Sequence, residues 1–221
     1  MPTSAKPPRH EAPSPYGATD TYHHGNLRVA CVDAGVHLVE EDGPDAVTIR
    51  GVARITGVSH TAPLHHFRDR HELLDAVADR GFDLLRGRLD DALASTAGPT
   101  QALRAYGMAY VDHAVEHPGL FALMFRPDAN LQGGAAYRRL VDLTAAAQSA
   151  GEMPGRDPDA LGLLIWATVH GLAGLYGSGH LASGQVAGPP TDHRPATAAV
   201  LDQLLGALGA AAVAIPKSPA R

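Results

Sequence analysis

Apolar residues recur at helical spacing along almost the whole chain, and glycine and proline divide them into segments. Gly43-Pro44 ends the first of these segments. Aromatic residues make up only 5% of the chain, and no segment has a convincing strand pattern. These features predict an all-α fold. The apolar residues of the first segment lie on one helical face, at Leu27, Ala30, Cys31, Ala34 and Leu38.

The composition is that of a globular protein. Of the 221 residues, 45% are hydrophobic and 19% are charged, so the chain can bury a real core. The single cysteine, Cys31, excludes a disulfide framework and a cysteine-based zinc module, and its place on an apolar face favours burial over a redox role. No apolar run reaches about 18 residues, and the N-terminus has no secretory signal pattern. We therefore expect a cytoplasmic protein without a membrane partner.

Two short helices separated by a tight turn are predicted between residues 48 and 67. Thr48 suits the N-cap of the first helix, and Gly57 closes it. After Val58-Ser59, a second short helix is expected to run through Pro63–Phe67. This spacing is typical of a helix-turn-helix motif, in which the turn sets the second helix across the first so that one exposed helix can enter a DNA major groove.

Positive charge gathers at this motif, although the whole chain has a formal net charge of −5. Residues 47–71 contain four arginines and four histidines against one acid, Asp69. Clustered positive charge is what contact with phosphate needs. A solvated charged face of an ordinary helical protein has the same composition, so charge alone leaves both interpretations open.

Six further helices are predicted beyond the motif, which gives about nine in the chain. The most apolar of them has apolar residues on nearly every side and is expected to be buried on most faces. It spans 159–176. All six are expected at 69–97, 100–116, 119–125, 137–149, 159–176 and 196–214.

The stretch from Tyr22 to about Phe82 resembles the DNA-binding domain of the TetR family of bacterial transcriptional regulators, and the spacing matches without a gap. The later part resembles a branch of that family with a Trp, three residues and then His-Gly, here Trp166 to Gly171, together with a segment like 116–125. The matching residues of the first stretch are Asn26-Leu27, Gly43-Pro44, Thr48-Ile49-Arg50, Val52-Ala53, Gly57-Val58-Ser59, His65-His66-Phe67, Arg70 and Leu73-Leu74.

The resemblance implies a three-helix DNA-binding domain followed by a larger helical domain that binds an effector and dimerises. The implied function is a ligand-responsive regulator, usually a repressor, that binds a palindromic operator in double-stranded DNA as a homodimer and responds to an unknown small molecule. Helices at about 159–177 and 196–214 would form the dimer interface. The expected domains are a disordered tail at 1–20, the helix-turn-helix domain at 21–70, the effector-binding and dimerisation domain at 71–214 and a frayed tail at 215–221.

The resemblance also indicates which residues approach DNA. Arg50 has the forked side chain that fits a guanine edge, whereas Thr48 and Arg70 are expected to hold phosphates. The family often has Leu-Tyr where this chain has Pro63-Leu64, so a phenolic contact to phosphate is lost, although Leu64 can touch a thymine methyl. Pro63 is also expected to delay the start of the second helix. The expected contact residues are Thr48, Arg50, His60, Thr61, Leu64, His65, His66 and Arg70.

Aromatic and histidine residues of the second part suggest an apolar ligand pocket with one polar handle, although core packing explains most of them equally well. Trp166 and His170 lie one turn apart and are expected to share an environment. His113 and His117 form an i, i+4 pair that suits a pocket or packing better than a metal, and we predict no metal and no cofactor. The candidate ligand-binding residues are His113, His117, Phe121, Met124, Phe125, Trp166 and His170.

An enzyme is the main competing class, but the sequence offers no nucleophile elbow, phosphate-binding loop or metal motif. We therefore expect no enzymatic activity. A helical ligand-binding or scaffold protein that no longer binds DNA is the remaining alternative, because Leu64 and the modest local charge leave room for it.

Overall fold

The structure, a computed structural model, describes residues 27–127, 134–153, 157–178 and 192–210. Within these residues every regular element is a helix, with eight α-helices and two short 3-10 helices. The all-α prediction is therefore confirmed. Both predicted tails, the segment from Tyr22 to Asn26 and the end of the last predicted helix at 211–214 lie outside the described residues.

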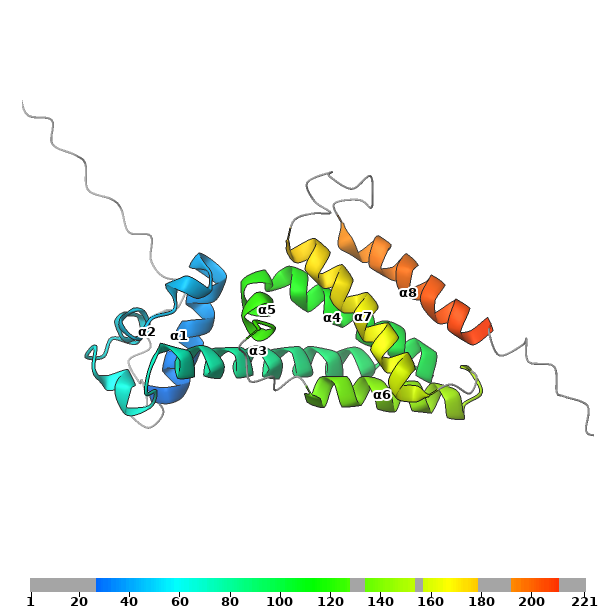
Figure 1. The fold of residues 1–221 in the computed structure, drawn as a ribbon, viewed down its shortest axis with the longest axis horizontal. Coiled ribbons are helices and arrows are strands. Elements are labelled where there is room, and N and C mark those ends of the chain that lie inside the picture. The colour runs from blue at the N-terminus through cyan, green and yellow to red at the C-terminus, as the bar shows by residue number, and fades with distance from the viewer. Residues whose placement is uncertain (1–26, 128–133, 154–156, 179–191, 211–221) are drawn as a thin grey trace, which may run out of the picture.

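The first helices form a head at one end of the molecule (Figure 1). It consists of α1 (Leu27–Asp42), the 3-10 helix η1 (Pro44–Ala46), α2 (Ile49–Thr56), the 3-10 helix η2 (Ala62–His65) and the start of α3 (Arg70–Leu93). Helix α1 packs against α2 and α3, and η2 contacts α1 and α2. The head thus has the helix-turn-helix order that the sequence predicts.

Local chemistry sets the boundaries of these helices. Gly43 and Gly57 have φ angles of 82° and 71°, in the left-handed region that glycine enters without a steric cost, and they end α1 and α2. The Thr48 side chain accepts a hydrogen bond from the Gly51 amide at 2.9 Å, as an N-cap does. The Asp69 side chain caps α3 in the same way through the Glu72 amide.

The second helix of the motif is shorter than the sequence predicts. It is a four-residue 3-10 helix over Ala62–His65, so Phe67 lies beyond it. The delay past Ser59 that we expect from Pro63 is present, because η2 begins one residue before that proline. Pro63 itself is buried, whereas Leu64 next to it is 49% exposed.

The head is built around side chains from α1, α2, α3 and the segments that join them. Cys31 is fully buried, as its place on the apolar face predicts. Phe67 is also buried, and the Arg28 guanidinium lies over its ring at 5.2 Å from the centroid. Val58 is only partly buried. The buried side chains that line the centre of the head are Cys31, Leu38, Val47, Val52, Ala53, Phe67 and Leu73.

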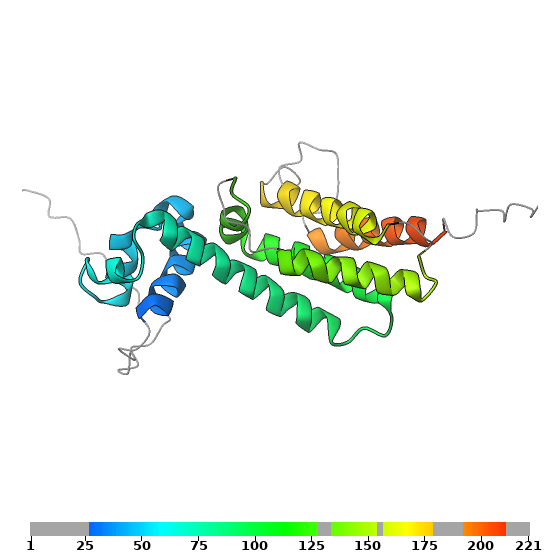
Figure 2. The same cartoon turned by 60° about the horizontal axis from the view of Figure 1, so that its bottom comes forward.

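The remaining helices form a body in which α4 (Pro99–Glu116) is central. Helix α4 packs against α3, α5, α6, α7 and α8 (Figure 2). These helices begin and end within a few residues of the predicted ranges. Their bounds are α5 (Pro118–Met124), α6 (Gly134–Ser149), α7 (Pro158–Gly177) and α8 (His193–Ala210).

A buried carboxylate ties α8 to α4. Asp112 is 4% exposed, and its two oxygens accept hydrogen bonds from His193 Nε2 at 2.8 Å and from an Arg194 guanidinium nitrogen at 2.6 Å. A carboxylate buried in this way requires such partners, because an unpaired buried charge is strongly destabilising. The start of α8 is therefore fixed to the middle of the body.

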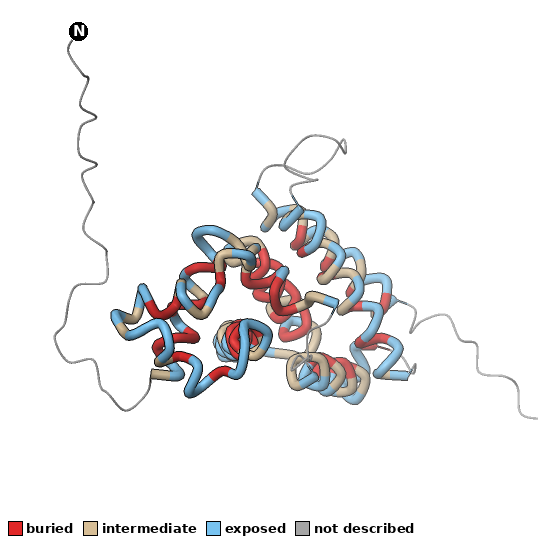
Figure 3. The backbone as a smooth tube through the Cα atoms, turned by 60° about the vertical axis from the view of Figure 1, so that its left-hand side comes forward, coloured by how far each residue is buried: buried red, intermediate tan, exposed pale blue. Residues whose placement is uncertain are grey.

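Helix α7 is not buried on most faces in the single chain, so that prediction is wrong. Leu163, Leu164 and Leu175 are 52%, 43% and 44% exposed. Figure 3 distinguishes the buried positions (red) from the exposed positions (pale blue) of the helices. Among the described helices, α7 is also the one whose length and hydropathy would suffice for a membrane span, but it packs against α4, α6 and α8 as a helix of the bundle.

The head meets the body at a close contact between α5 and α1. A Cβ atom built on Gly119 would lie 2.6 Å from the backbone oxygen of Val39, which is too short for any real contact. Glycine is therefore required at this point, because the obstacle is backbone and not a flexible side chain.

We predict that Gly119→Ala lowers the free energy of unfolding by about 1–3 kcal/mol, because the added methyl group forces α5 away from α1. Denaturant unfolding measures the change. The matched control is Gly87→Ala in α3, where no atom lies within 4 Å of the added carbon. There the higher helix propensity of alanine should raise stability by up to about 1 kcal/mol. An equal response of the two variants would contradict the close contact.

Candidate functional site

The outer end of the head exposes most of the residues that the sequence predicts to approach DNA. Arg50 is exposed on α2, and Leu64 is half exposed at the tip of η2. The Thr48 hydroxyl accepts the capping hydrogen bond from Gly51, which leaves its own proton free to donate to another group. The other exposed members of the set are His60, Thr61, His65 and His66.

The four arginines of this region differ in how they are engaged. Arg68 pairs with Glu72, with 2.9 Å between Nε and Oε2. Arg70 donates from Nε to the Val47 carbonyl at 2.7 Å and from a terminal nitrogen to the Pro44 carbonyl at 2.8 Å. Its guanidinium thus holds the loop before α2 against α3, and its contact with a phosphate stays a prediction.

Arg50 and Arg54 remain as exposed cations one helical turn apart on α2. Within the described residues, neither has an ion-pair partner. The net positive charge at this end of the head therefore comes mainly from these two side chains.

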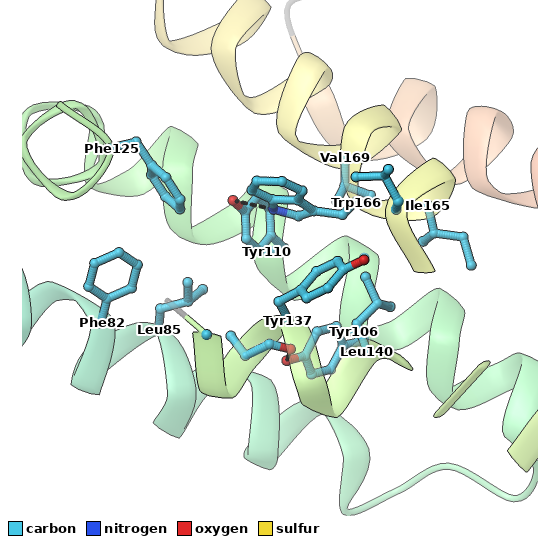
Figure 4. Close-up of a pocket in the computed structure, with 14 residues that line it drawn as sticks. Phe82, Leu85, Tyr106, Tyr110, Phe125, Tyr137, Leu140, Ile165, Trp166 and Val169 are labelled. Atoms are coloured by element: carbon cyan, nitrogen blue, oxygen red, sulfur yellow. Dashed lines mark hydrogen bonds between the residues drawn. The ribbon is translucent and has the colours of Figure 1, made fainter. Parts of the chain in front are cut away.

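A cavity of about 450 Å³ lies inside the body, between α3, α4, α6 and α7 (Figure 4). Among the described residues its wall is almost entirely apolar or aromatic, and none of these lining side chains is charged. The lining residues are Phe82, Leu85, Tyr106, Gly107, Tyr110, Phe125, Gly134, Ala136, Tyr137, Leu140, Leu163, Ile165, Trp166 and Val169.

One chain of hydrogen bonds crosses the cavity wall. The Trp166 indole N–H donates to the Tyr110 hydroxyl at 3.3 Å, as the dashed line in Figure 4 marks. The Tyr110 hydroxyl lies 2.9 Å from Nδ1 of His170. Because the indole can only donate, the phenolic oxygen accepts from it and the phenolic proton is available for Nδ1.

Burial favours the uncharged form of three residues at the cavity. Burial raises the pKa of the Tyr110 and Tyr106 hydroxyls, so both stay protonated. Burial also lowers the pKa of the His170 imidazole, which favours its uncharged form. The Tyr106 hydroxyl donates to the backbone oxygen of Ala136 at 2.8 Å.

Five of the seven candidate ligand residues cluster near this cavity. Phe125 and Trp166 line it. Trp166 and His170 do share an environment, with ring centroids 5.4 Å apart. Phe121 packs behind the wall against His170, and Met124 is fully buried beside Gly81. Phe121 and Met124 therefore support the lining residues and do not themselves form the surface of the cavity.

His113 and His117 lie on α4 and at its end, away from the cavity lining. Their rings are tilted by 49° to each other with centroids 5.1 Å apart, and His117 Nδ1 lies 3.6 Å from a carboxylate oxygen of Glu40. Among the described residues there is no group of three or more potential metal ligands. His113 is 1% exposed, and within the described part of the chain its Nε2 has no hydrogen-bond partner. The pair packs the junction of α4 with α1.

Sequence reasoning missed the tyrosines of the cavity. Tyr106 and Tyr110 lie on the apolar face of α4, and Tyr137 comes from α6. The i, i+4 spacing of Tyr106 and Tyr110 places both on one side of the helix. That spacing was a usable signal, but it does not reveal which helix faces them across the core.

This arrangement is that of a two-part regulator, with an exposed helix-turn-helix head and a helical body that contains an apolar cavity. Residues 32–77 match the family described as bacterial regulatory proteins, tetR family. Residues 103–204 match the family described as tetracyclin repressor-like, C-terminal domain. The chain belongs to the TetR family.

Individual relatives agree with this assignment. The HTH-type transcriptional repressor KstR2 of Mycobacterium tuberculosis is 33% identical over 93 residues, which is 42% of this chain and 46% of that protein. The match thus spans about half the length of the repressor. A solved protein of unknown function from Rhodococcus sp. RHA1 is 35% identical, with a TM-score of 0.73 over 86% of this chain and 99% of that one.

Two more distant structures share the fold. The ketosteroid transcriptional regulator KstR2 of M. tuberculosis has a TM-score of 0.57 at 22% identity, over 82% of this chain and 94% of that one. AibR, solved in complex with isovaleryl coenzyme A and operator DNA, has a TM-score of 0.55 at 18% identity, over 83% of this chain and 98% of that one.

We predict that His113 makes the protein less stable in acid. Burial, with smaller contributions from His117 and Arg88, lowers the pKa of the His113 imidazole from 6.5 to about 4. The unfolded chain therefore takes up a proton between about pH 6.5 and 4 that the folded chain does not. Stability from this group is complete above pH 6.5 and falls as the pH decreases through that window, by roughly 2–3 kcal/mol at pH 4.5.

The variant His113→Phe should retain stability at pH 7 and lose this part of the acid sensitivity, as measured by urea unfolding at pH 7 and 4.5. Substitution of an exposed histidine, His60→Gln, is the control. If the Phe variant and the wild-type chain lost equal stability between the two pH values, the buried neutral state of His113 would be refuted.

Proposed function

We propose that the protein is a ligand-responsive transcriptional repressor that binds a palindromic operator as a homodimer. The observation that carries this proposal is that one chain combines an exposed helix-turn-helix, with the unpaired cations of α2 beside it, and an apolar cavity in the body. Neither an enzyme nor a simple scaffold needs both. The likeness to KstR2, a repressor, and to AibR, which was solved with isovaleryl coenzyme A and operator DNA, supports the same function.

In the proposed DNA complex, η2 and the start of α2 face the major groove. Arg50 reads a base edge, and Thr48 donates its free hydroxyl proton to a phosphate. Leu64 touches a thymine methyl where a tyrosine would bind phosphate. Two heads occupy successive major grooves, about 34–36 Å apart.

The proposed dimer forms through α7 and α8. Among the described residues of the body, the exposed leucines of α7 are the large apolar side chains left uncovered, and small residues lie between them on the helix. Monomeric proteins rarely leave a contiguous apolar surface open to water, so a second copy is the natural cover. We place the chain in the branch with the Trp-x3-His-Gly segment, in the cytoplasm, with no enzymatic activity of its own.

We predict that Arg50→Ala weakens operator binding about tenfold or more, because a bidentate contact to guanine contributes about 1–3 kcal/mol. The operator is first selected from a random DNA pool, and affinity is then measured by gel shift over a range of salt concentrations. The matched control is Arg138→Ala on the exposed side of α6, which should bind as the wild-type chain does.

Two results would contradict the proposal that the head binds DNA. One is unchanged affinity of a well-folded Arg50→Ala protein. The other is the absence of any salt-dependent binding by the wild-type chain, which would favour a scaffold that has lost DNA binding.

We predict that the double variant Leu164→Glu with Leu175→Glu converts the dimer to a monomer at micromolar concentration, as measured by analytical ultracentrifugation. Both side chains are exposed in the single chain, so the substitutions should leave the fold intact. Operator affinity should fall with the dimer, because two half-sites can no longer be bound together. The control is the pair Asp142→Gln with Asp83→Gln on other exposed faces, and a variant that stays dimeric would refute this interface.

A further inference from the structure

We propose that the cavity binds an uncharged, ring-containing molecule with a single hydrogen-bonding oxygen, which is recognised at the Tyr110 hydroxyl. This inference rests on the proposed function, because it names the class of effector for the same cavity. It excludes carboxylates, phosphates and other anions from the interior of the body.

The shape and surface of the cavity favour rings. Aromatic side chains approach it from four directions, with Phe82 from α3, Tyr106 from α4, Tyr137 from α6 and Trp166 from α7 (Figure 4). Flat apolar walls of this kind make offset-stacked or edge-to-face contacts with a ring. A volume of about 450 Å³ lies in the lower part of the range of about 300–1,000 Å³ for pockets that enclose small ligands.

Charge is excluded because the wall offers nothing to neutralise it. None of the described lining side chains is charged. An anion that entered would exchange its hydration shell for apolar surface, at a cost that no cation among these lining residues offsets.

The hydrogen-bond chain from Trp166 to His170 supplies the one polar handle. The Tyr110 oxygen has a second lone pair that neither neighbour uses, so it can accept from a ligand hydroxyl. The indole N–H reaches it at 3.3 Å, longer than the usual 2.9–3.0 Å for such bonds. A ligand oxygen placed between Trp166 and Tyr110 can therefore take over this weak hydrogen bond as an acceptor.

The test uses three probes of equal ring size on the full chain: 2-naphthol, naphthalene and 2-naphthoate, with isovaleryl coenzyme A as a polyanionic comparison. Affinities are measured by isothermal titration calorimetry, and the shift in melting temperature is recorded in parallel. We expect 2-naphthol to bind most tightly, naphthalene less tightly, and 2-naphthoate at least about tenfold more weakly than 2-naphthol. Isovaleryl coenzyme A should not bind measurably.

Two variants distinguish the hydrogen bond of the Tyr110 hydroxyl from the apolar contacts of the cavity. Tyr110→Phe should weaken 2-naphthol about fivefold and leave naphthalene unchanged, because only the hydroxyl is removed. Tyr106→Phe is the matched control, since this buried phenol also lines the cavity but donates to the Ala136 carbonyl. It should leave the preference for 2-naphthol over naphthalene unchanged.

Equal or tighter binding of 2-naphthoate or isovaleryl coenzyme A overturns the proposal, and so does failure of both neutral probes to bind up to their solubility limits. Unchanged or improved binding of 2-naphthol to Tyr110→Phe overturns the assignment of the handle. Operator binding is measured on the same preparation. If the neutral probes bind and no operator is found, the proposed function fails while the proposed ligand class stands. If an operator is bound and the neutral probes are not, the ligand class fails while the proposed function stands.

Discussion

Helix α3 runs through both parts of the molecule, and its close packing at two points joins the head to the body. In the head, a Cβ atom on Gly35 of α1 would lie 2.4 Å from a methyl carbon of Val77. In the body, a Cβ atom on Gly81 would lie 2.7 Å from the sulfur of Met124 in α5. Because a glycine allows close approach at each of these contacts, the 24-residue helix α3 packs tightly against α1 in the head and against α5 in the body.

The consequence is that one continuous helix links the two functional regions. The N-terminal turn of α3 is held beside the loop before α2 by Arg70, and its later turns supply Phe82 and Leu85 to the cavity wall. The same helix therefore begins at the candidate DNA-binding surface and lines the ligand cavity. A shift in one region cannot leave the other unaffected unless α3 bends.

Local signals in the sequence predicted the head well. Gly57 with its left-handed φ, the Thr48 cap and the apolar face that contains Cys31 act over a few residues, and all three are as expected. The length of the second helix was not predictable from them. Pro63 limits where that helix can begin, but its end after His65 depends on how Phe67 is drawn into the core of the head.

Prediction in the body failed where the answer depends on partners distant in sequence. The apolar residues on all sides of α7 indicate that much of its surface must be buried. They do not show whether the same chain or another molecule buries it, and in the single chain Leu164 and Leu175 are exposed. The cavity is a similar case. Trp166 and Phe125 were identified by their chemistry, whereas Tyr110 emerged only when α4 was seen to face α7.

A ligand in this cavity can influence the head only through contacts that differ between two arrangements of the helices. Phe125 lines the cavity directly after α5, and Gly119 at the other end of α5 lies against the backbone of α1. Arg126 next to Phe125 pairs with Asp75 on α3. The gap between α5 and α1 at Gly119 is too small for one methyl group, so α5 has no free space toward α1. In the proposed response, a ligand ring that displaced Phe125 would push on α5, and this close contact would carry the displacement to α1 and the head.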